Sequence, residues 1–285
     1  DKKISIVTVD FKSKNEQFYT PRLHVKYDIN KNSIIKISGG KGYRIANVLS
    51  ENTGLMATSK KIIFSEDLKT EEAWNYGISF TQYFKIKDKK TTFTLDFYRT
   101  DFINQVVVDM DKNIDEIWFY NLREKSFSNS MQAEIISEPI KRLEINMAFR
   151  INDVKTTTNG ILDKKPFVNK YKGLVTLSYA TEFEKWKFDA TFQYNGNSRL
   201  LSTDSLPSQY RREKFSPDYV ILFLQITKNF KNWNVYAGVE NLTGFVQKDP
   251  IIGYDDPFGI YFDASQIWGP LAGRGFYAGL RLNIK

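Results

Sequence analysis

Apolar and polar residues alternate along residues 74–98, which predicts two β-strands joined by a tight polar turn. A period of two residues gives a strand one apolar face and one polar face. The apolar positions of the two arms are Trp74, Tyr76, Ile78, Phe80, Phe84 and Ile86, then Phe93, Leu95 and Phe97. Such a hairpin fits a soluble sheet with one buried face, and it also fits a membrane barrel with lipid outside and a wet lumen inside.

Strand-like runs recur along the whole chain, and no segment shows a convincing helical pattern. In the seventh run, for example, Leu143, Ile145 and Met147 alternate with polar residues. We therefore predict an all-β chain of about 12 antiparallel strands. The expected strands lie near residues 4–10, 19–28, 33–43, 73–86, 91–109, 115–136, 142–156, 169–182, 185–198, 217–230, 232–243 and 272–284.

The connections between the runs alternate in length. Short polar turns are expected at 30–32, 87–90, 138–142, 183–186 and 229–232, and long connections at 44–72, 157–168, 199–216 and 244–271. The connection after the fifth run is short, and we expect its long flanking strands to project beyond a bilayer. Outer-membrane barrels have tight periplasmic turns and long extracellular loops. The alternation therefore favours a membrane barrel over a soluble sandwich.

The two faces of the predicted strands agree with this interpretation. Near the short turns the apolar face carries aromatic residues, as an interfacial belt does: Tyr27, Phe84, Trp186, Phe230 and Trp233. The polar face carries charges of both signs, which a dry core accepts only as pairs but a wet or plugged lumen accepts readily. These are Lys26, Lys36, Asp96, Glu134, Glu144, Arg150, Asp189, Glu240 and Arg281. A soluble antiparallel β-protein remains the alternative on the pattern alone.

Composition narrows the class of protein further. Charged residues make up 26% of the 285 residues, the mean hydropathy is −0.43, and no apolar run approaches the roughly 20 residues of a transmembrane helix. The sequence contains no cysteine, so disulfides and thiolate chemistry are excluded. The net charge is +8, but lysine and arginine are scattered instead of clustered, so nucleic acid is not an expected partner. The chain opens on a strand-like run, which implies a removed leader or a piece of a longer protein.

Few residues suggest chemistry. The single histidine, His24, has no G-x-S-x-G motif to accompany it, so neither a catalytic triad nor a metal site is predicted. The glycines of 39–42 lack the helix that follows a phosphate-binding loop, and we interpret them as close backbone approaches. Met56, Met110 and Met131 are too scattered for a copper site. We expect no enzyme activity and no cofactor.

Binding residues are expected in the long loops. In the last loop, Asp249, Asp255, Asp256 and Asp263 are interpreted as a solvated surface and not as a Ca²⁺ site. The aromatic residues of this loop either form a ligand platform or pack loop against loop. The candidate ligand-binding residues are Arg44, Asn47, Glu51 and Asn52 after the third run, and Tyr254, Asp256 and Trp268 in the last loop.

Several motifs resemble the later barrel strands of TonB-dependent receptors from Bacteroidetes. The most specific are GVENLT at 238–243 and WGPLAGRGFYAGLRL at 268–282. Others are TPRLHVKYDINKN (20–32), ISGGKGYRIANVLSEN (37–52), AWNYGISFTQYF (73–84), DFYRTDFINQVVVDMD (96–111) and FYNLREKSFSNSMQAE (119–134). The resemblance covers essentially the whole chain.

This resemblance implies a 22-stranded outer-membrane barrel filled by an N-terminal plug, which imports ferric siderophores, haem, cobalamin, metal complexes or glycans with energy from TonB. Residues 1–285 would then be a partial barrel, the C-terminal half. The implied partners are the plug and the N-terminal strands (in the same protein or a separate chain), TonB through the plug, and outer-membrane lipid. A surface lipoprotein is a further candidate partner.

The sequence departs from the family pattern in three respects. It contains no plug and no TonB-contacting box, and it ends on 283–285 without the usual terminal aromatic residue. An alternative is a stand-alone 12-stranded barrel that acts as a passive channel or envelope enzyme, in which the strand at 4–10 pairs with the strand at 272–284. A secreted β-rich binding module is a third possibility.

Overall fold

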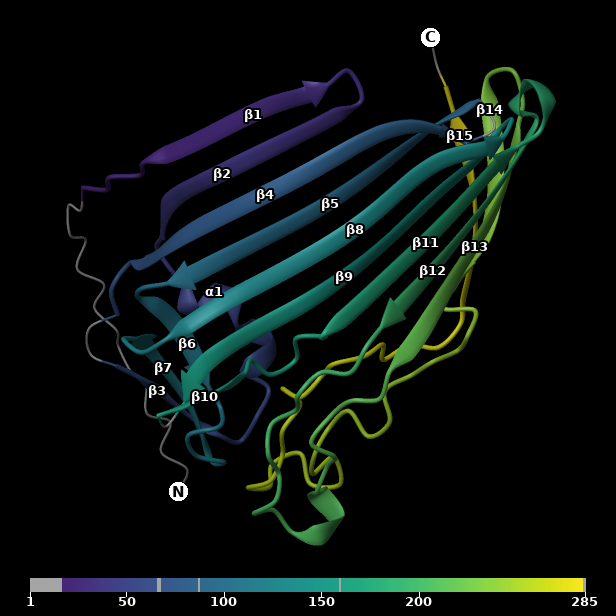
Figure 1. Ribbon diagram of the computed structural model, residues 1–285. Coiled ribbons are helices and arrows are strands. Elements are labelled where there is room, and N and C mark those ends of the chain that lie inside the picture. Colours follow the sequence, from purple (N-terminus) through teal and green to yellow (C-terminus); the bar gives the residue numbers. More distant parts are fainter. Residues whose placement is uncertain (1–16, 66–67, 87, 159, 284–285) are drawn as a thin grey trace.

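The computed structural model describes residues 17–65, 68–86, 88–158 and 160–283 (Figure 1). Strands dominate it, and they are joined by three 3₁₀ turns and one short helix. The strands are β1 (Arg22–Asn30), β2 (Ser33–Arg44), β3 (Lys61–Phe64), β4 (Glu71–Ile86), β5 (Lys89–Phe102), β6 (Gln105–Asp109), β7 (Glu116–Leu122), β8 (Ser126–Ile140), β9 (Leu143–Thr158), β10 (Ile161–Lys164), β11 (Tyr171–Ala180), β12 (Trp186–Asn195), β13 (Tyr219–Asn229), β14 (Trp233–Glu240) and β15 (Gly275–Leu282). The helix is α1 (Val48–Glu51), and the 3₁₀ turns are Thr53–Leu55, Glu182–Glu184 and Ser208–Tyr210.

Twelve strands form one antiparallel sheet, which confirms the predicted class and strand number. Its order is β1-β2-β4-β5-β8-β9-β11-β12-β13-β14-β15, with β10 attached to β9. Each strand of this path therefore pairs with the next strand of the sheet along the chain. Within the described residues, β1 and β15 each have one neighbour, so both edges of the sheet are open. The expected strand at 4–10 lies outside the described residues.

The strand register places the two parities in straight rows across the sheet. One row is apolar throughout: Val25, Ile37, Ile78, Phe97, Met131 and Ile151. The adjacent row is polar: Lys26, Lys36, Ser79, Asp96, Gln132, Arg150 and Lys172. Because cross-strand neighbours share a face, each parity forms a continuous surface, as the alternation predicted.

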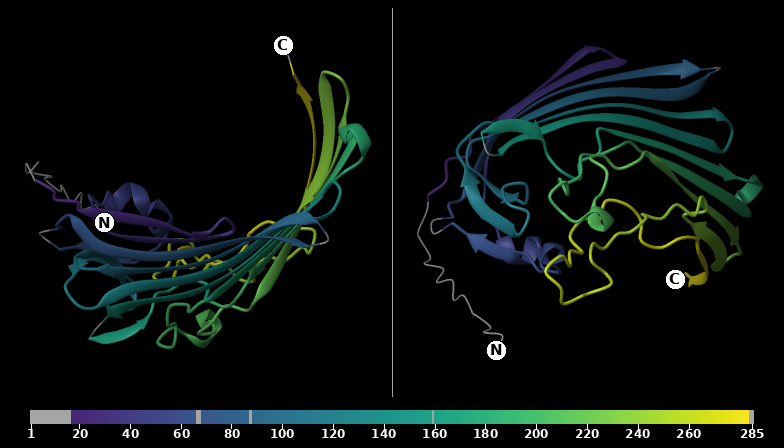
Figure 2. Two further views of the ribbon diagram at one scale, coloured as in Figure 1. Left: turned by 45° about the horizontal axis from the view of Figure 1, so that its top comes forward. Right: turned by 90° about the horizontal axis from the view of Figure 1, so that it is seen from below.

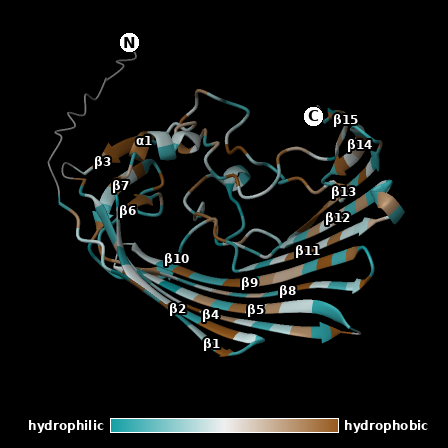
Figure 3. Cartoon of the chain, turned by 90° about the horizontal axis from the view of Figure 1, so that it is seen from above, coloured by the Kyte–Doolittle hydropathy of each residue, from teal (hydrophilic) through white to brown (hydrophobic). Residues whose placement is uncertain are grey.

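The sheet curves into an open trough, and the polar face is the concave one. Figures 2 and 3 show α1 and the loops on the inner side of the curve. Thr156 and Thr158 of β9, which belong to the polar parity, line a pocket together with Val48 of α1. The apolar parity therefore covers the convex face, where Phe97 and Met131 are more than 40% exposed. An apolar outer face of this kind matches a surface that contacts lipid.

The short turns all lie at one end of the sheet, as predicted (Figure 1). They join β1 to β2, β4 to β5, β8 to β9, β11 to β12 and β13 to β14. The expected aromatic residues stand near these turns with exposed side chains, and Phe230 stacks on Trp233 with ring centroids 4.0 Å apart. Lys228 lies 4.8 Å above the Trp186 ring. Paired aromatic and cationic groups at this level suit a membrane interface.

The connection after the fifth run differs from the prediction. The runs 91–109 and 115–136 were each expected to be one strand, and both predictions are wrong. After β5 the amides of Ile103 and Asn104 bond to the carbonyl oxygen of Glu72, which turns the chain out of the large sheet. β6 and β7 then form a separate three-stranded sheet with β3, which runs parallel to β7. The alternation of short and long connections therefore has no exception.

The small sheet encloses the main apolar core of the loop region. Ile117 and Phe119 of β7 are almost fully buried against Val48 of α1. The sequence pattern did not predict α1, β3 or β10. In the described part of the chain, no helix is long and apolar enough to cross a membrane.

Candidate functional site

The long connections contact one another over the concave side of the sheet. The connection between β2 and β4 meets the connection between β14 and β15, although these strands lie near opposite edges of the sheet. The amide of Ser59 donates to the carbonyl of Phe262 at 2.8 Å, and the amide of Ala264 donates to the carbonyl of Ala57 at 2.9 Å. These two loops therefore form a bridge across the mouth of the trough.

A buried ion pair holds this bridge together. Lys60 Nζ lies 2.9 Å from Asp263 Oδ2, and the two side chains are 10% and 4% exposed. Ser265 donates from its hydroxyl and its amide to Asp263 Oδ1. Burial alone would raise the pKa of Asp263, but the Lys60 charge and the Ser265 hydrogen bonds outweigh it and lower that pKa. The interpretation of Asp263 as a solvated loop residue is therefore wrong.

Arg199 joins three further connections. Its guanidinium binds both carboxylate oxygens of Asp111, at 3.2 and 2.6 Å, and donates to the carbonyl of Lys164 at 2.6 Å. A bidentate arginine–carboxylate pair fixes orientation as well as distance. Arg199 thus ties the β12–β13 loop to the β6–β7 turn and to the end of β10.

A pocket of about 270 Å³ lies among these loops, between α1, the small sheet and the segment after β10. Its apolar lining comes from Ala46, Val48, Leu55, Val106, Val107, Val108, Met110, Pro166 and Phe167. Its charged lining comes from Arg44, Glu51, Asp109, Asp111, Lys164, Lys165 and Arg199. Apolar surface with convergent polar groups is the usual lining of a small-ligand site, and this pocket combines the two with an unusually large share of charges.

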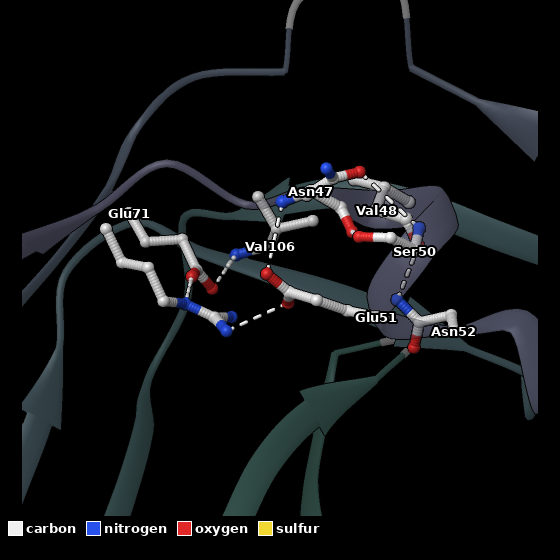
Figure 4. A network of polar contacts seen from close by, with 8 residues as sticks. Asn47, Val48, Ser50, Glu51, Asn52, Glu71 and Val106 are labelled. Atoms are coloured by element: carbon white, nitrogen blue, oxygen red, sulfur yellow. Dashed lines mark hydrogen bonds and ion pairs between the residues drawn. The ribbon is translucent and has the colours of Figure 1, made fainter.

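Three of the predicted residues line this pocket: Arg44, Glu51 and Asn52. Figure 4 shows the polar contacts around Glu51, Asn52 and Glu71. Arg44 contacts Glu71 directly and also donates to Glu51 at 2.9 Å. Glu71 in turn accepts the amide of Val106 at 2.9 Å, which attaches the small sheet to the start of β4. The hydrogen bonds to two carboxylates raise the pKa of Arg44. Arg44 and Glu51 therefore build the wall of the pocket.

Asn47 and Asn52 form hydrogen bonds at the two ends of α1. The Asn47 side chain accepts the amide of Ser50 at 3.4 Å, as an N-cap does. The Asn52 amide group donates to the carbonyl of Val48 at 2.7 Å. Both side chains thus fix the ends of a four-residue helix that would not persist without such contacts.

Five charged residues of the pocket were not singled out from the sequence: Asp109, Asp111, Lys164, Lys165 and Arg199. Lys165 is the one that differs from the others. Within the described residues, no carboxylate lies within 4.0 Å of its ammonium. Lys165 is an exposed residue on the pocket surface, yet the pocket walls desolvate its ammonium and lower its pKa, against the opposing effect of Glu71. Among the described residues, this cation has no carboxylate partner of the kind that Arg44 and Arg199 have.

The three residues predicted in the last loop lie apart from the pocket lining. Tyr254 is 69% exposed. Asp256 begins a turn in which the amide of Gly259 donates to its carbonyl at 2.9 Å. Trp268 lies about 6 Å, centroid to centroid, from both rings of the stacked Tyr219–Phe245 pair. Within the described part of the chain, no group of three or more acidic, histidine or cysteine residues is placed to hold a metal ion.

A sequence model named "TonB dependent receptor-like, beta-barrel" matches residues 3–242. The chain belongs to the TonB-dependent receptor family. A search of curated protein sequences found no match. Solved structures of TonB-dependent receptors share the fold with this chain. The ferric enterobactin receptor PfeA of Pseudomonas aeruginosa gives a TM-score of 0.65 at 15% identity, over 92% of this chain and 39% of that one.

Two other solved structures give similar results. The ferric-catecholate import receptor Fiu of E. coli gives a TM-score of 0.58 at 13% identity, over 91% of this chain and 34% of that one. The copper transporter OprC gives 0.65 at 12% identity, over 92% and 38%. The chain therefore spans less than half the length of the structures it matches, which fits one half of a TonB-dependent receptor barrel.

Proposed function

We propose that this chain forms the C-terminal wall of an outer-membrane receptor that imports a scarce nutrient with energy from TonB. The observation that carries the proposal is the covered mouth of the trough: at the end with the long connections, every loop is tied to another above a charged concave surface. A passive pore has no need of such a cover. A receptor that captures its substrate before transport needs this surface.

The remaining parts of the receptor follow from the open sheet. Unpaired strand edges are unfavourable in lipid because each free backbone group costs several kcal/mol. We propose that N-terminal strands close the barrel on β1 and β15, and that a plug fills the polar concave side and contacts TonB. Outer-membrane lipid would cover the convex face. A surface lipoprotein is a further candidate partner above the exposed tip around Tyr254.

The substrate class we propose is a ferric siderophore, haem, cobalamin or another metal complex. The solved relatives named above include receptors for ferric enterobactin and ferric catecholates and a copper transporter. In this chain we propose that Arg44, Glu51 and Asn52 contribute through the pocket they line, and that Tyr254 and Asp256 contribute from the last loop. Trp268 and Asn47 would act by holding the loops in place. The described residues suggest no bond-making chemistry.

The test is uptake by intact cells. A strain that lacks the gene is compared with the complemented strain for accumulation of radiolabelled ferric siderophores, haem, cobalamin and copper. We expect one class to enter only in the complemented strain, and a protonophore or deletion of TonB to abolish that entry. Uptake that continues at full rate without TonB would instead indicate a passive channel.

A further inference from the structure

The charged side chains that line the 270 Å³ pocket differ in whether they have a partner in the protein. Arg44 is engaged by Glu71 and Glu51, and Arg199 by Asp111. Asp109 accepts the Tyr120 hydroxyl at 2.7 Å and the amides of two following residues. Each of these groups therefore already has its partner in the protein.

Two lysines remain, and they differ. Lys164 lies 5.5 Å above the Phe215 ring, so its ammonium has an aromatic partner. Lys165 has no carboxylate in reach among the described residues, and it lies on the same pocket wall as Pro166 and Phe167. An ammonium that lines a pocket beside apolar side chains is well placed to pair with an anionic group that enters with an apolar body.

Size and charge define the ligand class more closely. A cavity of about 150 Å³ accepts benzene, so 270 Å³ accepts two fused rings with one small substituent. Three carboxylates line the same pocket, on Glu51, Asp109 and Asp111. These carboxylates already have partners in the protein, as Arg44 and Arg199 do. Among the described lining residues, Lys165 is therefore the charge that a single ligand carboxylate would match.

We propose that this pocket binds a small aromatic monocarboxylate, with the carboxylate on the Lys165 ammonium and the rings against Val106, Val108 and Phe167. Only the biological role of this site rests on the proposed receptor function. In a receptor, the bound carboxylate would be part of the imported compound or a separate small ligand of the loops. The interaction itself follows from the pocket.

The experiment uses the intact protein in lipid nanodiscs and 2-naphthoate as the probe, with binding to empty nanodiscs subtracted. We expect saturable binding, and weaker binding of the neutral isostere 2-naphthamide. Lys165→Met should weaken 2-naphthoate binding by about 10- to 100-fold, the usual effect of losing a hydrogen bond to a charged group. Lys165→Arg should retain most of the affinity, because it keeps the charge.

The matched control is Lys248→Met, which removes an exposed lysine from another loop of the same end. It should leave binding unchanged. Lysine acylation followed by mass spectrometry gives a second measurement, in which 2-naphthoate should protect Lys165 and not Lys248. The proposal is overturned if the intact protein shows no saturable binding, or if Lys165→Met binds as well as the unmodified protein. If either of these results is found together with TonB-dependent uptake, the binding proposal fails but the proposed receptor function holds. If 2-naphthoate binds but no uptake is seen, the receptor function fails and the binding site holds.

Discussion

The buried Lys60–Asp263 pair predicts a large effect for one substitution. Asp263→Ala removes the counter-ion of an ammonium whose side chain is 10% exposed, together with the acceptor of the Ser265 hydrogen bonds. Breaking a buried pair on one side costs about 3–5 kcal/mol, because the remaining charge stays unpaired. The cost falls on the loop bridge, so the free energy of opening the bridge should decrease by that amount.

Hydrogen exchange measures this opening directly. The amides of Ser59 and Ala264 donate across the bridge, so they exchange only when the two loops separate. At roughly 1.4 kcal/mol for each factor of ten, a loss of 3–5 kcal/mol lowers their protection by about two to three and a half orders of magnitude. The amides within the large sheet should keep their protection. The double variant Lys60→Met with Asp263→Ala should recover part of the loss, because no unpaired charge remains.

The control is Glu213→Ala, which removes an exposed carboxylate from the neighbouring β12–β13 loop. The reasoning is refuted if Asp263→Ala changes the exchange protection of the two amides no more than this control does.

The pH dependence gives an independent check. The pKa of Asp263 is lower in the folded protein than its ordinary value, so the pair contributes fully above about pH 4. Its contribution is lost only as the pH falls further, through the folded pKa, and the bridge should stay closed between pH 5 and pH 7.

Three further predictions concern other parts of the chain. Gly238→Ala should destabilise the barrel by about 1–3 kcal/mol in urea unfolding, because an added Cβ would lie 2.4 Å from the Tyr277 ring; Gly42→Ala, which meets open space, should not. Arg199→Ala should increase proteolysis of the three connections it joins, and a cleavage pattern identical to that of the unmodified protein would contradict its bridging role. Trp233→Ala removes an aromatic partner at the level of the short turns and should lower the yield of membrane-inserted protein without altering the loop bridge.

The repeating features of the fold were predictable because they are local. The alternation around Ile78 and Phe97 determines which side chains share a face, and turn lengths determine which strands are neighbours. The small sheet was not predictable in this way. The run 105–109 contains three consecutive valines, so it has no period that would separate it from β5. The chain leaves the large sheet through bonds to the carbonyl of Glu72, about 30 residues earlier in the sequence, and no local pattern records them.

The candidate site was predictable only in outline. Ligand-binding residues were expected after the third run. Two of them, Arg44 and Glu51, line a pocket, and their role in binding stays a prediction. Lys165 gave no signal, because what distinguishes it is that no carboxylate of the described residues is within reach, and this depends on how the loops are arranged. Lys60 stands next to Lys61 in a polar stretch and reads as a surface residue, and only the position of Asp263 shows that it is buried.

The sequential strand order of the large sheet has a consequence for the way the protein folds. Each strand in the main order of the sheet pairs with the strand of that sheet that precedes it in the sequence. The sheet can therefore grow from one edge with little loss of loop-closure entropy. The bridge is the opposite case, since Ser59 and Phe262 are 203 residues apart. Contacts of such high sequence separation are slow to form. We therefore expect the trough to be complete before its mouth is covered, so that the concave side stays open to an incoming partner until the last stage of assembly.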